Sequence, residues 1–362
     1  MPNIARSIIR DSLRVKEDEP VIIQAGAHTV DLATEVALEA FKVGADPAIL
    51  FENDDFFYGQ FKHLTEKQLR KTSAHCLGIA DYVKSYVYIG GVENPEPMRR
   101  VPKAKWAAMF AGEDAHHRKN LEKKQKSVGV ALGAVTRARA KTYGFNYAKW
   151  KKMVEDAITV DYNEMRRRGA VLAELFRRPA KIRITADNGT DLRFQLAGEA
   201  RRTHVDDGVL SDEDIAMGNT NTSIPAGAAF IAPVEDSARG TIVSDVAIPS
   251  IGTLIEGLAW TFENGRVVDF RAKKNLASAQ INFAEGSGDK DRLGVFGIGL
   301  NKKVAPAYLT PYYARGTVSV GIGDNQDYGG ANTSSYGFFA FQGHATVTID
   351  GKPIVEEGRL VA

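Results

Sequence analysis

The N-terminal part of the chain alternates between short apolar runs and amphipathic stretches. β-branched residues fill the first run, and apolar side chains then recur at helical spacing up to Phe41. A capping sequence, Thr65-Glu-Lys-Gln68, begins a second amphipathic stretch. The predicted strands are 20–26, 48–51 and 82–89, and the predicted helices are 29–43 and 65–75. Strands that alternate with helices predict a small parallel α/β domain.

The pattern changes twice along the rest of the chain. Residues 113–176 are predicted to be helical, and Pro179 ends that region. Alternating runs and turn sequences then predict mainly β-structure. The predicted strands are 181–185, 190–196, 241–246, 258–262, 267–272, 315–321 and 345–349. The Gly-rich segments 294–299 and 321–330 allow close backbone approach but lack the context of a nucleotide site.

These patterns predict an α/β protein of two domains. Residues 1–180 form an α/β domain with a helical segment, and residues 181–362 form a β-rich domain that carries the active site. A composition of 44% hydrophobic and 25% charged residues is that of an ordinary soluble globular protein. No apolar segment approaches the ~18 residues of a membrane span, so we expect a cytoplasmic protein without a membrane partner. The single cysteine, Cys76, excludes an internal disulfide.

Charge is unevenly distributed. Residues 99–183 contain 22 Lys and Arg against 8 Asp and Glu, although the whole chain carries a net charge of only +2. This basic segment lacks the interleaved aromatic residues and the recognised motifs of a nucleic-acid-binding protein. We therefore expect solvated helices, paired with acidic residues elsewhere or with a second subunit, and no nucleic-acid partner.

An ordered series of short motifs in the second half resembles one family. The series is Thr190-Asp-Leu192, Ile224-Pro-Ala-Gly-Ala-Ala-Phe-Ile-Ala-Pro233, Gly240-Thr-Ile-Val243, Phe262-Glu-Asn-Gly-Arg-Val-Val268, Arg292-Leu-Gly294 and Asn332-Thr-Ser334. It resembles the thermophilic metallo-aminopeptidases of the aminopeptidase T and aminopeptidase S type, and the similarity spans most of the chain. The resemblance implies that family's fold, a homodimer and a hydrolase active site with two divalent metals.

The positions of the family's metal ligands carry other residues here. The resemblance places these positions at Ala228, Val295, Ser319, Gly337 and Phe339. Ala, Val, Gly and Phe have no side-chain lone pair for a metal, and Ser is a poor substitute. We therefore expect no cofactor and no ordinary two-metal site, with a divalent metal at a different site as the alternative.

A second resemblance concerns the ring-opening 2,5-dihydroxypyridine dioxygenases, which share the scaffold. It is carried by the Asp-Ser-Ala-Arg-Gly-Thr sequence at 236–241. The resemblance implies one ferrous ion held by two His and one Asp. Those ligands would fall on Val295 or Phe296, Gly337 and Phe339, so this site too has lost its donors.

Polar residues near the replaced positions supply candidate chemistry. Carboxylates and a phenol among aromatic side chains can act as base and acid without a metal. The candidate catalytic residues are Asp324, Asp327, Tyr336 and His204, and the candidate substrate-binding residues are Asn221, Ala228, Val295, Ser319, Asn332, Gly337 and Phe339. The Asp-Asn-Gln-Asp run at 324–327 is also a composition that is common in turns.

The sequence supports four functional hypotheses. The first is a small-molecule hydrolase that cleaves an amide-like or heterocyclic C–N bond without the two-metal site. The alternatives are a metal-dependent aminopeptidase with displaced ligands, a ring-cleaving dioxygenase-like enzyme, and a binding protein without catalysis. The substrate and the nucleophile are not specified by the sequence.

Overall fold

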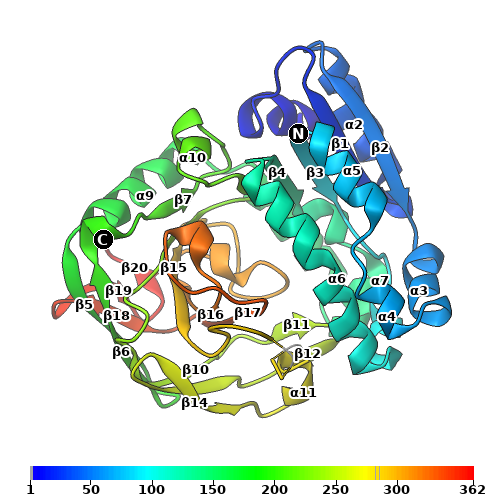
Figure 1. Ribbon diagram of the computed structural model, residues 1–362. Coiled ribbons are helices and arrows are strands. Elements are labelled where there is room, and N and C mark those ends of the chain that lie inside the picture. The colour runs from blue at the N-terminus through cyan, green and yellow to red at the C-terminus, as the bar shows by residue number, and fades with distance from the viewer. Residues whose placement is uncertain (1–2, 282, 285) are drawn as a thin grey trace. The chain divides into compact units, whose positions relative to one another are not determined.

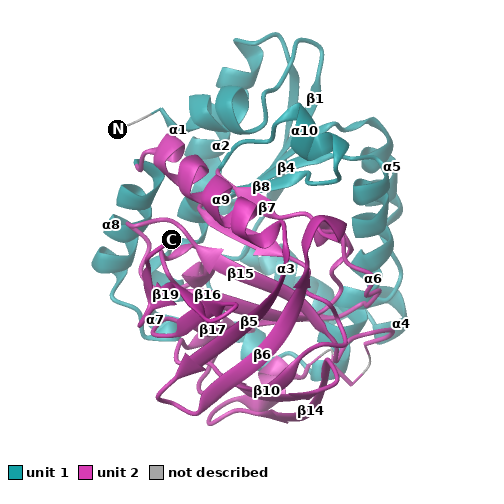
Figure 2. Ribbon diagram, turned by 90° about the vertical axis from the view of Figure 1, so that its left-hand side faces the viewer, with its two compact units in different colours: residues 1–159, 208–225 teal, residues 160–207, 226–362 magenta. Residues whose placement is uncertain are grey.

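The computed structural model describes residues 3–281, 283–284 and 286–362. The chain forms two compact units, coloured separately in Figure 2. Unit 1 contains residues 1–159 and 208–225, and unit 2 contains residues 160–207 and 226–362. The sequence-based division was placed at 180/181. The helix over residues 162–176 belongs to unit 2 in the structure. The later segment 208–225 belongs to unit 1, because its strand Asn221–Ile224 completes the sheet of that unit.

Unit 1 is built on a five-stranded parallel sheet (Figure 1). Its strand order is β2 (Asp46–Glu52), β1 (Pro20–Gly26), β3 (Ser85–Ile89), β4 (Lys126–Val130) and β8 (Asn221–Ile224). Its helices are α1 (Ile4–Arg6), α2 (Val30–Phe41), α3 (Asp54–His63), α4 (Glu66–Leu69), α5 (Ala74–Tyr82), α6 (Lys103–Glu122), α7 (Arg137–Tyr143), α8 (Tyr147–Ile158) and α10 (Asp212–Ala216). The parallel α/β prediction is confirmed.

Two local predictions in unit 1 are wrong in their boundaries. The helix predicted over 65–75 is two short helices, α4 and α5, although the capping box of Thr65 and Gln68 forms as expected. The predicted helical region 113–176 contains the strand β4. Its sequence, Lys-Ser-Val-Gly-Val, has too few apolar residues to indicate a strand, and pairing with β3 and β8 determines its conformation.

Unit 2 contains two larger antiparallel sheets. The eight-stranded sheet has the order β14 (Arg266–Arg271), β13 (Ala259–Glu263), β10 (Arg239–Val243), β6 (Thr190–Ala197), β5 (Pro179–Ala186), β18 (Thr346–Ile349), β19 (Lys352–Glu356) and β20 (Arg359–Leu360). The five-stranded sheet has the order β17 (Gly337–Gln342), β16 (Val318–Gly323), β15 (Leu293–Gly299), β9 (Ala228–Ile231) and β7 (His204–Asp206). A small β11 (Ile248–Ser250) and β12 (Thr253–Ile255) pair and helices α9 (Tyr162–Phe176) and α11 (Leu276–Ala279) complete the unit.

One hydrophobic core joins the two large sheets of unit 2. Trp260 and Phe262 of the eight-stranded sheet and Phe296 of the five-stranded sheet belong to it and are almost fully buried. The β-rich prediction is therefore confirmed for this unit. The Gly-rich segment 294–299 is wholly buried in strand β15, which sequence reasoning did not assign as a strand.

Most cations of the basic helices pair locally. Lys152 and Asp156 on α8 are an example, as are Lys119 of α6 and Asp81 of α5 at 2.7 Å. None of the helices among residues 3–281, 283–284 and 286–362 has the length and apolarity needed to cross a membrane.

Candidate functional site

The five-stranded sheet of unit 2 has two chemically different faces. Alternate residues such as Ala229, Phe296 and Val320 point into the core. Directly opposed residues of antiparallel strands share a face, and the register pairs Ala228 with Gly299, and Gly297 with Ser319. We call the face that carries Ala228 and Ser319 the outer face.

All five replaced ligand positions lie on the outer face. Val295 lies opposite Gly321, which in turn lies opposite Phe339, and Gly337 lies opposite Gly323. Because residues two apart on a strand point the same way, these positions share the face of Ala228 and Ser319. Four neighbouring strands therefore bring together positions that are far apart in the sequence.

The outer face does not fit the metals that the resemblance implies. Of the five positions, only Ser319 has a side chain with a lone pair, and its buried hydroxyl has no hydrogen-bond partner in the described part of the chain. A Cβ placed on Gly321 would lie 2.8 Å from the ring of Phe339, and one on Gly297 would lie 2.3 Å from the ring of Phe230. Aromatic carbon therefore fills the space above these two glycines. The described residues contain no group of three His, Cys, Asp or Glu side chains that could hold a metal ion.

The edge strand β7 adds an imidazole and a carboxylate to this face. His204 pairs with Phe230 and Asp206 pairs with Ala228, so both side chains lie on the outer face. Asp206 is buried, with 6% exposure, and accepts a hydrogen bond of 2.6 Å from the hydroxyl of Tyr313. A carboxylate therefore lies one strand away from Ala228, one of the five replaced ligand positions. Sequence reasoning selected His204 but missed Asp206, although the alternation His-Val-Asp at 204–206 indicates a shared face.

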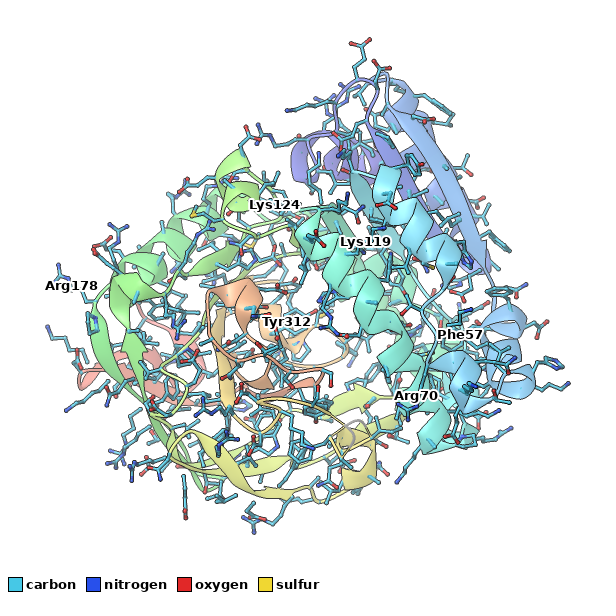
Figure 3. The ribbon with its side chains drawn as sticks, in the orientation of Figure 1. Phe57, Arg70, Lys119, Lys124, Arg178 and Tyr312 are labelled. Atoms are coloured by element: carbon cyan, nitrogen blue, oxygen red, sulfur yellow. The ribbon has the colours of Figure 1, made fainter. Side chains whose placement is uncertain are left out.

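Two tyrosines frame this part of the sheet. The ring centroid of Tyr328 lies 6.2 Å from that of His204 and 5.8 Å from that of Phe230. Tyr312, labelled in Figure 3, lies on the turn between β15 and β16. Its ring centroid is 6.1 Å from that of Phe341. Burial, and secondarily Asp206, raises the pKa of Tyr312 to about 12, and burial also raises the pKa of Tyr328. Both phenols therefore stay protonated at neutral pH and can donate hydrogen bonds.

The segment that carries Tyr328, which we call loop 324–335, is anchored by a buried carboxylate. Glu235 accepts hydrogen bonds from Arg201, from the amide of Ala331 at 2.7 Å and from Asn325 at 3.2 Å. Burial alone would raise the pKa of Glu235, but the hydrogen bonds and the charge of Arg201 lower it overall. Arg201 also donates to the backbone carbonyl of Gly329, next to Tyr328.

Two candidate residues of loop 324–335 hold its backbone. Asp324 accepts hydrogen bonds from the amides of Gln326 and Ser334. Asn332 is 1% exposed and donates to the carbonyls of Leu293 and Gly323. These contacts show that both residues support the backbone of the loop. That either residue takes a direct part in catalysis stays a prediction.

Of the three other candidates, Asp327 lies within loop 324–335, and Tyr336 and Asn221 lie away from the outer face. The hydroxyl of Tyr336 donates to the carbonyl of Ala279 at 2.7 Å, and its ring belongs to the core of unit 2. Asp327 lies in the turn before Tyr328. Asn221 belongs to unit 1, where it accepts a hydrogen bond from Ser127 of the neighbouring strand. The geometry therefore places His204 and Asp206 on β7 beside Ala228, with the ring of Tyr328 near His204, while the other four replaced positions lie on β15, β16 and β17 of the same face. The sequence did not single out Asp206, Tyr312 or Tyr328 as candidates.

Comparisons with known proteins agree with the resemblance. The chain superposes on wild-type AmpT from Thermus thermophilus with a TM-score of 0.76 at 18% identity, over 99% of this chain and 98% of that chain. It superposes on 2,5-dihydroxypyridine dioxygenase from Pseudomonas putida KT2440 with a TM-score of 0.59 at 14% identity, over 97% and 94% of the two chains. At these identities the likeness shows the fold alone.

A comparison with curated protein sequences found no match. The sequence model of the family described as thermophilic metalloprotease (M29) matches residues 1–305. That match includes the positions of Ala228 and Val295 and ends before β16 and β17, which carry the other three replaced positions. Since the matched residues make up most of the chain, this protein belongs to the thermophilic metalloprotease (M29) family.

Proposed function

We propose that this protein is a small-molecule hydrolase that cleaves an amide-like or heterocyclic C–N bond without the two-metal site of its family. The observation that carries the proposal is the composition of the outer face. Its five inherited ligand positions offer no adequate set of metal donors among the described residues, while His204 and Asp206 stand on β7, next to the strand that carries Ala228. The face thus presents a base and a carboxylate next to one of the positions at which a metal ligand is missing.

The side chains present suit a hydrolysis that uses acid and base groups. A histidine is the commonest general base, and His204 would take a proton from a water molecule as its oxygen attacks the substrate carbonyl. The phenol of Tyr328 would donate a hydrogen bond to the oxygen that becomes negative. When the C–N bond breaks, the protonated His204 would return the proton to the departing nitrogen, which balances the reaction.

The surroundings of His204 favour a small planar substrate. Tyr328 and Tyr312 are both half-buried. The ring of Tyr328 lies 6.2 Å from that of His204, and Tyr312 packs against Tyr313, which donates a hydrogen bond to Asp206. Aromatic side chains pack well against planar rings. The dioxygenase with the same fold is named for dihydroxypyridine, a small heterocycle, which is consistent with this substrate class.

A binding protein without turnover is the second candidate, because the same half-buried aromatic residues would serve binding alone. A metal enzyme with displaced ligands is supported less well. His204 and Asp206 could supply two donors, but the described residues bring no third His, Cys, Asp or Glu into a metal-binding group with them.

The test is turnover of a panel of aryl amides and cyclic amides by protein kept in excess chelator, with release of the amine as the readout. We expect turnover by the wild type, a loss of roughly 100- to 10,000-fold in kcat for His204→Asn, and a loss of roughly 100-fold for Tyr328→Phe. The matched control is His344→Asn, which removes an exposed histidine paired with Asp245 in the same unit.

Each outcome of this test has a distinct meaning. Turnover that needs an added metal, or that survives His204→Asn unchanged, would overturn the proposal. Saturable binding of a panel member without turnover would instead support the binding-protein candidate.

A further inference from the structure

A basic pocket lies at the amino-terminal edge of the parallel sheet in unit 1. The parallel strands β1, β3 and β4 begin side by side, with Lys84 directly before β3 and Lys126 as the first residue of β4. A cavity of about 310 Å³ opens there. It is lined by Leu13, Arg14, Lys16, Glu19, Lys84, Lys124, Lys126, Leu210, Asp212 and Ile215, a set we call the basic pocket.

The charges of the basic pocket are unbalanced. Its lining contains five cations and two carboxylates, which leaves an excess of three positive charges. Like charges gathered in one cavity repel one another, although the exposure of Lys16, Lys84 and Lys124 to water weakens the repulsion. Such an arrangement is maintained at a cost that a bound anion would offset.

Three of the five cations already have partners. Arg14 pairs with Asp212 at 3.3 Å, and Lys126 pairs with Glu19 at 2.8 Å. Lys124, which follows α6 and is labelled in Figure 3, donates to the carbonyl of Ala216. These contacts fix the walls of the pocket.

The other two cations, Lys16 and Lys84, have no partner within the part of the chain that the structure describes. Among the described residues, no hydrogen bond or ion pair reaches the ammonium group of Lys16 or Lys84, although both line the cavity. Arg14 and Lys124 in the same lining adopt left-handed backbone conformations, each with a φ of 51°.

We propose that the basic pocket binds a small anion that carries one or two phosphate groups. A phosphate group carries about −1.5 to −2 charges at neutral pH, so one or two of them match the excess of three positive charges. Lysine is a common phosphate ligand, and Lys16 and Lys84 together provide six N–H donors that no described residue accepts. The site lies in unit 1 and is independent of the reaction proposed for unit 2.

The test is calorimetric titration of the full chain with inorganic pyrophosphate at low ionic strength. We expect saturable binding that weakens when salt is raised, because salt screens the lysine charges. Lys84→Gln and Lys16→Gln should each weaken binding by about fivefold, and the double variant by about 25-fold. Both lysines are exposed, so these variants should fold normally.

The matched control is Lys152→Gln, which removes one lysine from a different basic pocket lined by Arg137, Tyr147 and Lys151. We expect its affinity for pyrophosphate to equal that of the wild type. The proposal would be overturned by an absence of saturable binding, or by binding that depends on Lys152 and not on Lys16 and Lys84.

Discussion

The Nη2 atom of Arg201 donates hydrogen bonds to both carboxylate oxygens of Glu235, at 2.9 and 2.8 Å. Both side chains are largely buried, with 18% and 10% of their surfaces exposed. Through Asn325 and Ala331, the same carboxylate holds loop 324–335. This ion pair therefore determines where Tyr328 lies beside His204.

Glu235→Ala should destabilise unit 2 strongly. The substitution leaves the largely buried charge of Arg201 without its carboxylate, and breaking a buried ion pair costs about 3–5 kcal/mol. The free energy of unfolding, measured by urea denaturation, should fall by that amount, whereas Glu263→Ala at an exposed position should change it little. A loss below about 1 kcal/mol would show that the ion pair does not anchor the loop.

The acid stability of unit 2 should depend on Glu164. Hydrogen bonds from Lys302, Arg315 and Arg168 lower the pKa of Glu164 from 4.5 to about 2. A depressed carboxyl pKa contributes stability that is fully present above pH 4.5 and is lost as pH falls toward about 2.

Glu164→Gln should therefore lower Tm at neutral pH, and its difference from the wild type should shrink between pH 4.5 and about 2. Thermal unfolding across this pH range measures the effect. Glu174→Gln is the matched control, because Glu174 lies on the same helix with one exposed partner, Arg177. A Tm difference that stays constant with pH would contradict the assignment.

Gly297→Ala should disturb the outer face, whereas Gly337→Ala should not. The new Cβ at position 297 would lie 2.3 Å from the ring of Phe230, while at position 337 its nearest neighbour is a carbonyl oxygen 3.8 Å away. Overpacking of this kind costs about 1–3 kcal/mol. Urea denaturation of both variants should show the difference, and equal stabilities would mean that Phe230 does not cover Gly297 in solution.

Asp206 and Tyr313 should be energetically coupled. Tyr313→Phe removes the hydrogen bond to a buried carboxylate and should cost about 1–3 kcal/mol of stability. A double-mutant cycle with Asp206→Asn, followed by urea denaturation, should give a coupling energy of about 0.5–3 kcal/mol. Additive effects of the two substitutions would indicate that their contact is absent or unimportant.

In unit 2, the strands that the sequence predicted most clearly are those with alternating polarity. The hairpin of β5 and β6 is an example, since buried Ile182 and Ile184 alternate with exposed Arg183. Strand β15 was missed because its sequence, Leu-Gly-Val-Phe-Gly-Ile-Gly, is buried throughout and rich in glycine. Aromatic rings and backbone atoms lie directly against these glycines and leave no room for a side chain. Only the folded sheet brings those atoms there.

The sequence predicted where the candidate site lies better than it predicted which residues form the site. The resemblance indicated five positions from separate strands, and the register places them on one face. Asp206 and Tyr313 are more than a hundred residues apart in the sequence, so their contact could not be inferred from local patterns. The support of Tyr328 by Glu235 was hidden for the same reason.

The central claim is that the outer face performs its reaction without the metals of its family. The most direct test is elemental analysis of protein purified without added metal or chelator, with turnover measured on the same sample before and after chelation. Our account predicts zinc, manganese and iron contents far below one equivalent and turnover unchanged by the chelator. A full equivalent of any of these metals, with turnover lost on chelation and restored by that metal, would contradict it.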